Sequence, residues 1–325
     1  MRLKILVVGG LNTDIIAHDV KKILQPGELT YGKKISIGPG GKPRNIAQMT
    51  ATLTGIGVVA MVGRTAKDPF GLWKIPYDSL KKAGVDTKNI TILDERAGQF
   101  PGIALIPVSK EGQNQIYVVP GVTNSFSPKD LDNTLNVFEI AAKNNGLLII
   151  TLEMPLRTVI HALKIANKTG LRVLLDPGGI EEGEDYSRLL SQKIFLIKPN
   201  VHEAKVLTGI EVKDEKSAGI AGKRLLEKGV ENVFITVGSD GGYFVTNGKC
   251  SHIPVPKIPI GKGKDETGCG DQTMAVIAAK LIDKVSLGEA LVSGMVGGAI
   301  QFGNSGIVPV TKKQLERGEK EAKKS

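Results

Sequence analysis

The sequence predicts an α/β fold in which a doubly wound, mainly parallel sheet is sandwiched by helices. After residue 124, short apolar segments alternate with helical segments of about 10–15 residues, which is the pattern of βα units in a parallel sheet. The 325 residues are 41% hydrophobic and 23% charged, so a mostly disordered chain is excluded. A chain of this length suits two or three domains, or one large α/β domain with an insertion.

The first half of the chain contributes alternating elements to this sheet. The apolar run 3–8 predicts a central strand that leads into Gly9. A helical period begins near Pro43 or Arg44 and ends at Gly55. The next expected elements are a strand at 56–62 and a helix at 70–83.

Two turn-rich stretches interrupt the alternation and predict a second, smaller sheet. Residues 29–31 and 34–37 have the character of short half-exposed strands, and another hairpin-like pair lies at 103–108 and 115–119. Although far apart in sequence, the two stretches could pair as one sheet that stands off the main body. The expected division is a main α/β domain at 1–12, 41–97 and 125–325, and a small sheet at 13–40 and 98–124.

The second half alternates strands and helices up to the C-terminal end. A helix opens at Ser127-Pro128, and two helices lie beyond Gly268. The expected strands are 147–150, 173–175, 194–197 and 233–237. The expected helices between them are 155–169, 203–207 and 216–228.

The charge distribution excludes some partners. The net charge of +10 could indicate nucleic acid, but the dense basic stretch 312–324 contains interspersed glutamates, and 4% aromatic residues are too few for stacking platforms. The uncharged run 290–311 is long enough to span a bilayer, yet its glycines and polar residues favour a buried helix that ends in a glycine turn. We expect a small-molecule ligand, and neither nucleic acid nor a membrane as partner.

The cysteine content bears on the compartment. Cys250 and Cys269 cannot form a disulfide framework for a chain of this size, which indicates a reducing environment. Residues 3–8 are too short for a signal-peptide core. The sequence therefore predicts a cytoplasmic protein.

Polar residues follow several of the expected strands. In doubly wound folds the ligand binds at the carboxyl ends of the strands, so side chains that follow different strands can converge on one site. A turn or cap role is the alternative for each of them taken singly. The residues in question are 10–14, Glu153, Asp176-Pro177, Lys198-Pro199-Asn200 and Gly238-Ser239.

The segment 265–271 (Asp-Glu-Thr-Gly-Cys-Gly-Asp) is the strongest local signal, because it opens a helix. Glycines allow close backbone approach, and a helix start offers unpaired N–H groups to an anion such as a phosphoryl group. Asp271 in the first turn has two interpretations. It could simply stabilise the helix dipole, or it could accept a proton from an attacking hydroxyl.

A second glycine-rich turn, 38–41, also precedes a helix. Lys42, Arg44 and Asn45 at that helix start can donate hydrogen bonds to hydroxyls or anions, although a purely structural turn is equally compatible. Other nucleotide and metal motifs are missing: no Gly-Lys pair is followed by Ser or Thr as in a P-loop, and the histidines and cysteines lack zinc-site spacing.

Four segments in order resemble the signatures of the ribokinase family of carbohydrate kinases, the phosphofructokinase-B superfamily, over essentially the whole chain. They are Asn12-Thr13-Asp14, 40–47 (Gly-Gly-Lys-Pro-Arg-Asn-Ile-Ala), Asn200-Val201-His202-Glu203, and 265–271. The resemblance implies a ribokinase-like fold and transfer of the γ-phosphoryl group of ATP to a sugar hydroxyl, with Mg²⁺ as cofactor. It also implies that the small sheet is a lid that closes over the sugar and pairs with a second subunit, giving a homodimer.

The resemblance further assigns roles to individual residues. Asp271 would be the general base, beside an anion hole of Gly268, Cys269 and Gly270. The sugar would be held by Asn12, Asp14, Gly41, Lys42, Asn45, Glu153 and Asp271. The nucleotide would be bordered by Asn200, Thr236, Gly238, Gly241 and Gly270. Asn200 and Glu203 would order the magnesium waters, although a helix cap with a first-turn carboxylate is the alternative.

Departures from the family pattern leave the substrate open. Pro43-Arg44 stands where small residues are usual, and Arg44 is either a solvated helix-start residue or a group that reaches a substrate phosphate. Ribokinases bind a monovalent cation, for which Asp265 and Thr267 are the candidates, but Val310 stands where a hydroxyl residue is expected, so K⁺ activation is doubtful.

Four functions follow from these features. A ribokinase making ribose 5-phosphate is favoured by Lys42 and Glu153. A nucleoside kinase of the same fold is the first alternative, and it would need an apolar cleft for the base beneath the lid. A phosphosugar kinase would use Arg44 with Lys33 or Lys34. A non-catalytic sugar or nucleotide sensor would have no need of the carboxylate at Asp271.

Overall fold

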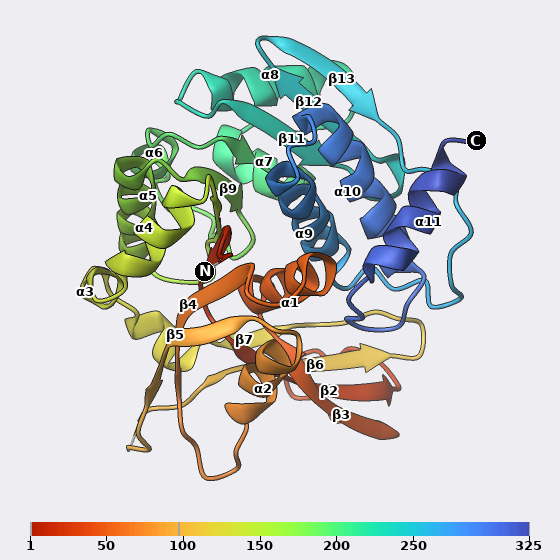
Figure 1. Cartoon of the computed structure of the whole chain (residues 1–325). Coiled ribbons are helices and arrows are strands. Elements are labelled where there is room, and N and C mark those ends of the chain that lie inside the picture. Colours follow the sequence, from red (N-terminus) through yellow and green to blue (C-terminus); the bar gives the residue numbers. More distant parts are fainter. Residues whose placement is uncertain (1, 97, 325) are drawn as a thin grey trace.

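The chain folds around one large sheet. In the computed structural model, which describes residues 2–96 and 98–324, the strands of this sheet lie in the order β13-β12-β11-β10-β9-β8-β1-β4-β5 (Figure 1). Neighbours from β11 to β5 are parallel, whereas β12 and β13 add an antiparallel edge. The bounds are β1 Ile5–Val8, β4 Val59–Ala66, β5 Asp86–Leu93, β8 Leu147–Thr151, β9 Arg172–Asp176, β10 Leu196–Ile197, β11 Asn232–Thr236, β12 Gly242–Thr246 and β13 Lys249–Ile253.

Helices cover both faces of this sheet because its central strands are apolar on both sides. In β1, Ile5 and Val7 pack with α1, α2, α9 and α10, whereas Leu6 and Val8 pack against α3 to α8 on the other face. This arrangement confirms the predicted doubly wound α/β fold. The helices are α1 Lys42–Thr54, α2 Lys74–Lys82, α3 Pro128–Asp132, α4 Leu135–Lys143, α5 Leu156–Thr169, α6 Ser187–Leu190, α7 Val201–Thr208, α8 Glu215–Leu226, α9 Cys269–Ile282, α10 Leu287–Phe302 and α11 Lys312–Ala322.

A second sheet of four strands lies beside α1 and α2, at the bottom of Figure 1, in the order β3-β2-β6-β7. Its strands are β2 Asn12–Val20, β3 Lys34–Gly40, β6 Gly102–Ser109 and β7 Tyr117–Val119. The central pair, β2 and β6, is parallel. The segments predicted at 13–40 and 98–124 therefore do come together in one sheet. The boundary residue 97 and the chain ends 1 and 325 lie outside the described residues.

Several elements differ from the sequence prediction. The stretch 29–31 is not a strand, and β2 instead begins at Asn12 and continues through residues that have no clear period. The predicted helix at 70–83 begins only at Lys74, after a turn. Strands β5, β12 and β13 were not predicted, because polar residues interrupt their apolar positions at or near the sheet edges.

The uncharged run 290–311 does not lie in a membrane-length helix. Within the described residues, no helix is both long enough and apolar enough to cross a bilayer. The first part of the run forms most of α10, which ends at Phe302 with Gly303 as its C-cap, and the rest of the run follows the helix. Gly294 and Gly297 allow α10 to lie close to α9, since a Cβ on Gly297 would come within 2.6 Å of Val276. These glycines therefore let α9 and α10 pack closely against each other.

Candidate active site

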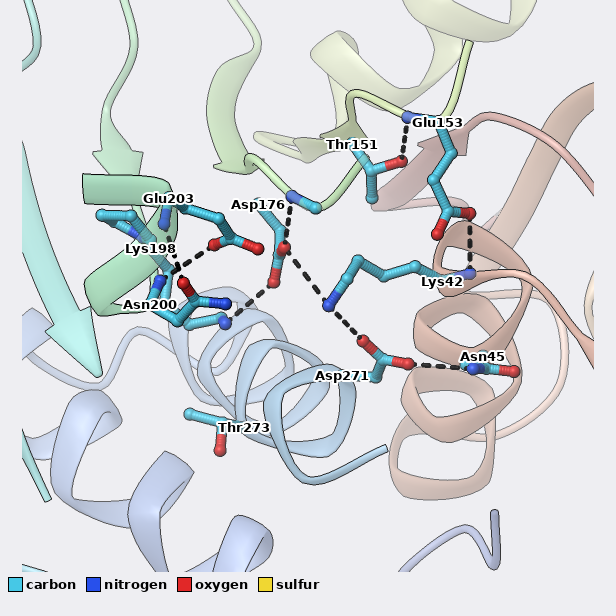
Figure 2. A network of polar contacts seen from close by, with 12 residues as sticks. Lys42, Asn45, Thr151, Glu153, Asp176, Lys198, Asn200, Glu203, Asp271 and Thr273 are labelled. Atoms are coloured by element: carbon cyan, nitrogen blue, oxygen red, sulfur yellow. Dashed lines mark hydrogen bonds and ion pairs between the residues drawn. The ribbon is translucent and has the colours of Figure 1, made fainter. Parts of the chain in front are cut away.

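The site is centred on Asp271, in the first turn of α9. The helix begins after Gly268, whose φ of 77° favours glycine. Asp271 is 6% exposed, and its two carboxylate oxygens accept hydrogen bonds of 2.9 Å from Lys42 Nζ and from Asn45 Nδ2 (Figure 2). Lys42 and Asn45, at the start of α1, thus orient the carboxylate of Asp271, although more than 220 residues separate them from it in the sequence.

The first turn of α9 lines the cavity that Asp271 also lines. The leading N–H groups of a helix have no intrahelical acceptor and can bind an anion. Gly268, Cys269 and Gly270 line the same cavity as Asp271, as expected for an anion hole. The N–H of Cys269, however, donates to Glu266 O at 3.1 Å, so it is already engaged in a turn.

Lys42 links three carboxylates. Its Nζ lies 2.9 Å from Asp271 Oδ1 and 3.4 Å from Asp176 Oδ1, and its backbone N–H donates to Glu153 Oε2 at 2.9 Å (Figure 2). Burial alone would lower the pKa of Lys42, but the charges of Asp176 and Asp271 outweigh it and hold that pKa well above its usual value. Lys42 therefore stays charged.

Asp176 and Lys198 form a buried ion pair. Their positions after two strands were visible in the sequence, but the pairing and its place in the site were not predicted. Lys198 Nζ lies 2.8 Å from Asp176 Oδ2, and both side chains are almost fully buried. Burial opposes ionisation of Asp176, but Lys198 and then Lys42 lower its pKa. A Cβ on Gly270 would lie 3.5 Å from Lys198 Nζ and 4.0 Å from Lys42 Nζ. Two ammonium groups therefore lie beside the proposed anion hole.

Asn12 and Asp14, two of the predicted sugar-binding residues, lie in β2 of the small sheet and are not among the residues that line the cavity around Asp271. A Cβ on Gly40 would lie 1.8 Å from Asp14 Oδ1, and one on Gly102 would lie 2.0 Å from Asn12 Oδ1. These glycines of the small sheet thus make room for the two polar side chains. Gly41 has a φ of 89° and places its backbone against Asn12.

Two carboxyl groups among the predicted sugar-binding residues have raised pKa values. Burial raises the pKa of Asp14 to about 6, and Asp271 adds to the effect while Arg44 opposes it. Burial likewise raises the pKa of Glu153 to about 7, against the influence of Lys42. Shifts of this size in a cluster of convergent groups are typical of functional sites.

The position of the Arg44 side chain contradicts both predictions for it, a solvated residue and a contact to a substrate phosphate. Its side chain is fully buried, so it is not a solvated residue. Nε donates to Gly40 O at 3.3 Å, Nη1 to Gln48 and Ser79, and Nη2 to Pro39 O at 2.8 Å and to Asn45 Oδ1. All five guanidinium N–H groups therefore have protein acceptors, and none is left for a substrate phosphate. The bond to Asn45 turns the amide nitrogen of Asn45 toward Asp271.

Asn200 and Glu203 form a capping box at the start of α7. The Glu203 N–H donates to Asn200 Oδ1 at 2.8 Å, and the Asn200 N–H donates to Glu203 Oε2 at 2.9 Å. The capping interpretation is thus correct, but both residues also line the cavity. No described donor reaches Glu203 Oε1, and burial followed by the charge of Asp176 raises the pKa of Glu203. An incompletely balanced carboxylate of this kind fits hydrated Mg²⁺.

A cavity of about 600 Å³ extends from these polar residues to an apolar wall. Thr236, Gly238 and Gly241, which were predicted to border the nucleotide, line this cavity. The apolar wall was not predicted from the sequence, because its parts come from a loop and from α10. It consists of Val255, Pro256, Ile258, Ile260, Met295, Ala299 and Phe302. The polar end suits a triphosphate and the apolar end suits a flat base.

The two candidates for a monovalent cation site are engaged within the protein. Asp265 Oδ1 accepts from the Thr267 N–H at 2.9 Å and Oδ2 accepts from the Gly306 N–H at 2.7 Å. Val310 is buried in an apolar cluster, and within the described part of the chain its backbone N–H donates to Gln272 Oε1 at 2.9 Å. No side-chain hydroxyl is present at that position.

A doubly wound sheet, a glycine-initiated helix with a buried carboxylate, and an adjoining cavity fit an enzyme that transfers a phosphoryl group to an alcohol. The model of the pfkB family of carbohydrate kinases matches residues 2–312, and the chain belongs to that family. It is 31% identical over 319 residues to a ribokinase from Haemophilus influenzae, covering 97% of this chain and 98% of the relative. It is 28% identical to a deoxyribokinase from Salmonella typhi, with 85% of each chain covered.

Solved structures agree with the fold. The structure of Arabidopsis thaliana ribokinase complexed with ribose and ATP matches with a TM-score of 0.83 and 25% identity, over 100% of both chains. Ribokinase from Thermotoga maritima matches with a TM-score of 0.82 and 26% identity, over 98% of this chain and 99% of the other. The protein is thus a ribokinase-like sugar kinase.

Proposed function

We propose that this kinase uses ATP and Mg²⁺ to phosphorylate a free pentose, with ribose as the preferred substrate and ribose 5-phosphate as the product. The observation that carries the proposal is the placement of Asp271 between Lys42 and Asn45, beside the first turn of α9 and at the polar end of the cavity. This carboxylate faces the sugar-binding residues on one side and the nucleotide cavity on the other.

The proposed reaction follows from these positions. A carboxylate oxygen of Asp271 takes the proton from the sugar hydroxyl. The hydroxyl oxygen forms a bond to the γ-phosphorus, and the bond between the γ-phosphorus and the leaving ADP oxygen breaks. The N–H groups of Gly268 and Gly270 and the ammonium groups of Lys42 and Lys198 offset the charge of the transferred phosphoryl group. When bound with the nucleotide, Mg²⁺ would neutralise phosphate charge through waters held by Asn200 and Glu203.

A free sugar is favoured over a sugar phosphate by the charges near the sugar-binding side. Asp14 and Glu153 can accept hydrogen bonds from hydroxyls but would repel a second phosphate. Arg44, the cation considered for that phosphate, has no free N–H. The relatives named above include kinases of ribose and of deoxyribose.

The test is a coupled assay with ATP across ribose, 2-deoxyribose, hexoses, nucleosides and sugar phosphates. We expect the highest kcat/KM with ribose. A nucleoside as best substrate would transfer the assignment to a nucleoside kinase, and ATP binding without turnover of any alcohol would point to a sensor.

The acid limb of the pH profile is expected to follow the sugar-binding carboxyl groups. Asp14 and Glu153, with pKa values of about 6 and about 7, must be ionised to accept hydrogen bonds, so kcat/KM for the sugar should rise between about pH 5 and 8. Because the folded pKa values are raised, the folded state binds these protons more tightly. This contribution to stability is fully present below the unfolded pKa values of 3.8 and 4.5 and is lost as pH rises through the folded values of about 6 and about 7.

The variant Asp14→Ala separates binding from chemistry. Losing a hydrogen bond to a charged group costs about 1.5–3 kcal/mol, so KM for the sugar should rise about 10–100-fold while kcat changes less. Asp78→Ala, an exposed position on α2, is the matched control. An unchanged KM in Asp14→Ala would contradict the proposed role.

A homodimer through the small sheet is part of the proposal. Strand register places Ile37, Ile15, Leu105 and Tyr117 in one row across the sheet, on the face opposite to Asp14. Ile37, Leu105 and Tyr117 in this row are exposed, and so is Ile35 on the same face. An apolar face of this kind on a small sheet fits a second copy of the same surface.

Sedimentation tests the dimer. We expect the wild-type chain to sediment as a dimer at micromolar concentration, and Leu105→Asp to sediment as a monomer that keeps its melting temperature. A monomeric wild type would refute the predicted dimer.

A further inference from the structure

Gln301 joins the loop before α9 to the loop after α10. It lies in the last turn of α10 and is fully buried. Its amide nitrogen donates one hydrogen bond to Thr267 O at 3.0 Å and another to Gly306 O at 2.7 Å. Both protons of a single –NH₂ group are therefore used to bridge the two loops. The amide oxygen accepts a long bond of 3.4 Å from Asn304.

The bridge acts directly on the anion hole. Thr267 C=O and Gly268 N–H belong to the same peptide group, and in a trans peptide they point in opposite directions. The nitrogen of Gln301 lies behind this peptide, 3.6 Å from where a Cβ of Gly268 would be. Holding the carbonyl therefore aims the Gly268 N–H, and the hydrogen bond polarises the peptide so that its N–H becomes a stronger donor.

The same atoms are those that a monovalent cation would need. Asp265 and Thr267 are the residues that the family resemblance assigns to such an ion, and Gly306 lies in the loop that leads to Val310. Here the two carbonyls face amide protons, both oxygens of Asp265 accept backbone N–H groups, and Val310 offers no hydroxyl. The –NH₂ group presents positive hydrogens toward the carbonyls, as a cation would present its charge. These residues do not fit a monovalent cation.

We propose that the side-chain amide of Gln301 replaces the monovalent cation, so that this kinase orders its anion hole without K⁺. Gln301 is a positioning residue, because it acts through the peptide between Thr267 and Gly268. The inference rests on the proposed function in that the anion hole is taken to bind the phosphate of ATP.

The first experiment uses the wild-type enzyme. Activity and ATP affinity are measured in KCl and in N-methylglucamine chloride at equal ionic strength, with ATP free of K⁺ and Na⁺. We expect less than a twofold difference in either quantity. An allosteric activator typically changes affinity by about 5-fold or more, so K⁺ activation of that size would overturn the proposal.

The second experiment removes the amide. Gln301→Ala leaves a space next to the freed carbonyls, and we expect weaker ATP binding and lower kcat that KCl restores in part but N-methylglucamine chloride does not. Gln301→Met fills the space without donors, so it should lose activity and show no rescue by K⁺. A variant Gln301→Ala with wild-type kcat and ATP affinity in the absence of K⁺ would refute the role of Gln301.

The controls separate this inference from the proposed function and from loss of folding. Gln314→Ala makes the same change at an exposed position of α11 and should leave the response to K⁺ unchanged. Melting temperatures show which variants are folded. If wild type transferred no phosphoryl group to any sugar, the proposed function would fail, but calorimetric ATP binding with and without K⁺ would still decide the role of Gln301.

Discussion

Replacing Asp271 with asparagine is expected to lower kcat by at least ~10²-fold, the usual effect of removing a general base. Asparagine has nearly the same shape, but its single amide oxygen can accept from only one of Lys42 and Asn45, and the side chain cannot take a proton from the sugar hydroxyl. Because the proposed nucleotide site consists mainly of the cavity and the first turn of α9, ATP affinity should stay close to that of the wild-type enzyme. Steady-state kinetics with ribose and calorimetry with a non-hydrolysable ATP analogue measure the two effects.

The same substitution at the other end of the helix provides the control. Asp283→Asn, at the exposed C-terminal end of α9, should leave kcat unchanged. Equal turnover in Asp271→Asn and wild type would remove Asp271 as the base. A parallel loss of ATP binding would instead indicate a structural role for this carboxylate.

Replacing Asp176 with asparagine is expected to cost about 3–5 kcal/mol of unfolding free energy, since the substitution leaves the buried ammonium group of Lys198 without a counter-charge. Lys42 would keep Asp271 as its partner. Because the pKa of Asp176 is lowered in the folded state, its stabilising contribution is present above the unfolded pKa of about 3.9 and is lost as pH falls through the folded value. Urea unfolding at pH 7 and in acid measures both effects.

A double variant distinguishes the ion pair from general damage. Asp176→Leu with Lys198→Met removes both charges, and a buried pair replaced by apolar residues is often neutral for stability. We expect the double variant to be more stable than Asp176→Asn but slow in phosphoryl transfer, because Lys198 is absent from the anion hole. Wild-type stability in Asp176→Asn would show that the pair contributes little.

The interior of the fold could be predicted from local patterns, but its edges could not. Strands such as β1 and β8 are uninterrupted apolar runs because helices cover both of their faces. Strands β2, β5 and β13 carry charged or polar residues at exposed positions, so their period is weak. The expected strand at 29–31 was wrong because apolar residues there, including Leu29 and Tyr31, are exposed outside any ladder.

Within the site, residues inside a local motif could be found and residues that act through distant contacts could not. The glycine turns and Asp271 were visible as motifs at helix starts. Arg44 has the same motif position, but its burial depends on Pro39 and Ser79 in other elements. Gln301 lies 34 residues from Thr267 and has no sequence signal beyond its place in an apolar helix. Buried polar residues of this kind are recognised only from the folded chain.

The guanidinium of Arg44 connects the small sheet to the residues around Asp271. It donates hydrogen bonds to the last carbonyls of β3, at Pro39 and Gly40. It also donates to Asn45 Oδ1, and the amide nitrogen of Asn45 donates to Asp271. If the small sheet moved when a sugar binds, as the family resemblance implies for a lid, the movement would displace that amide. The position of Asp271, the proposed proton acceptor, would then depend on whether a sugar is bound, through the contacts of Arg44 and Asn45.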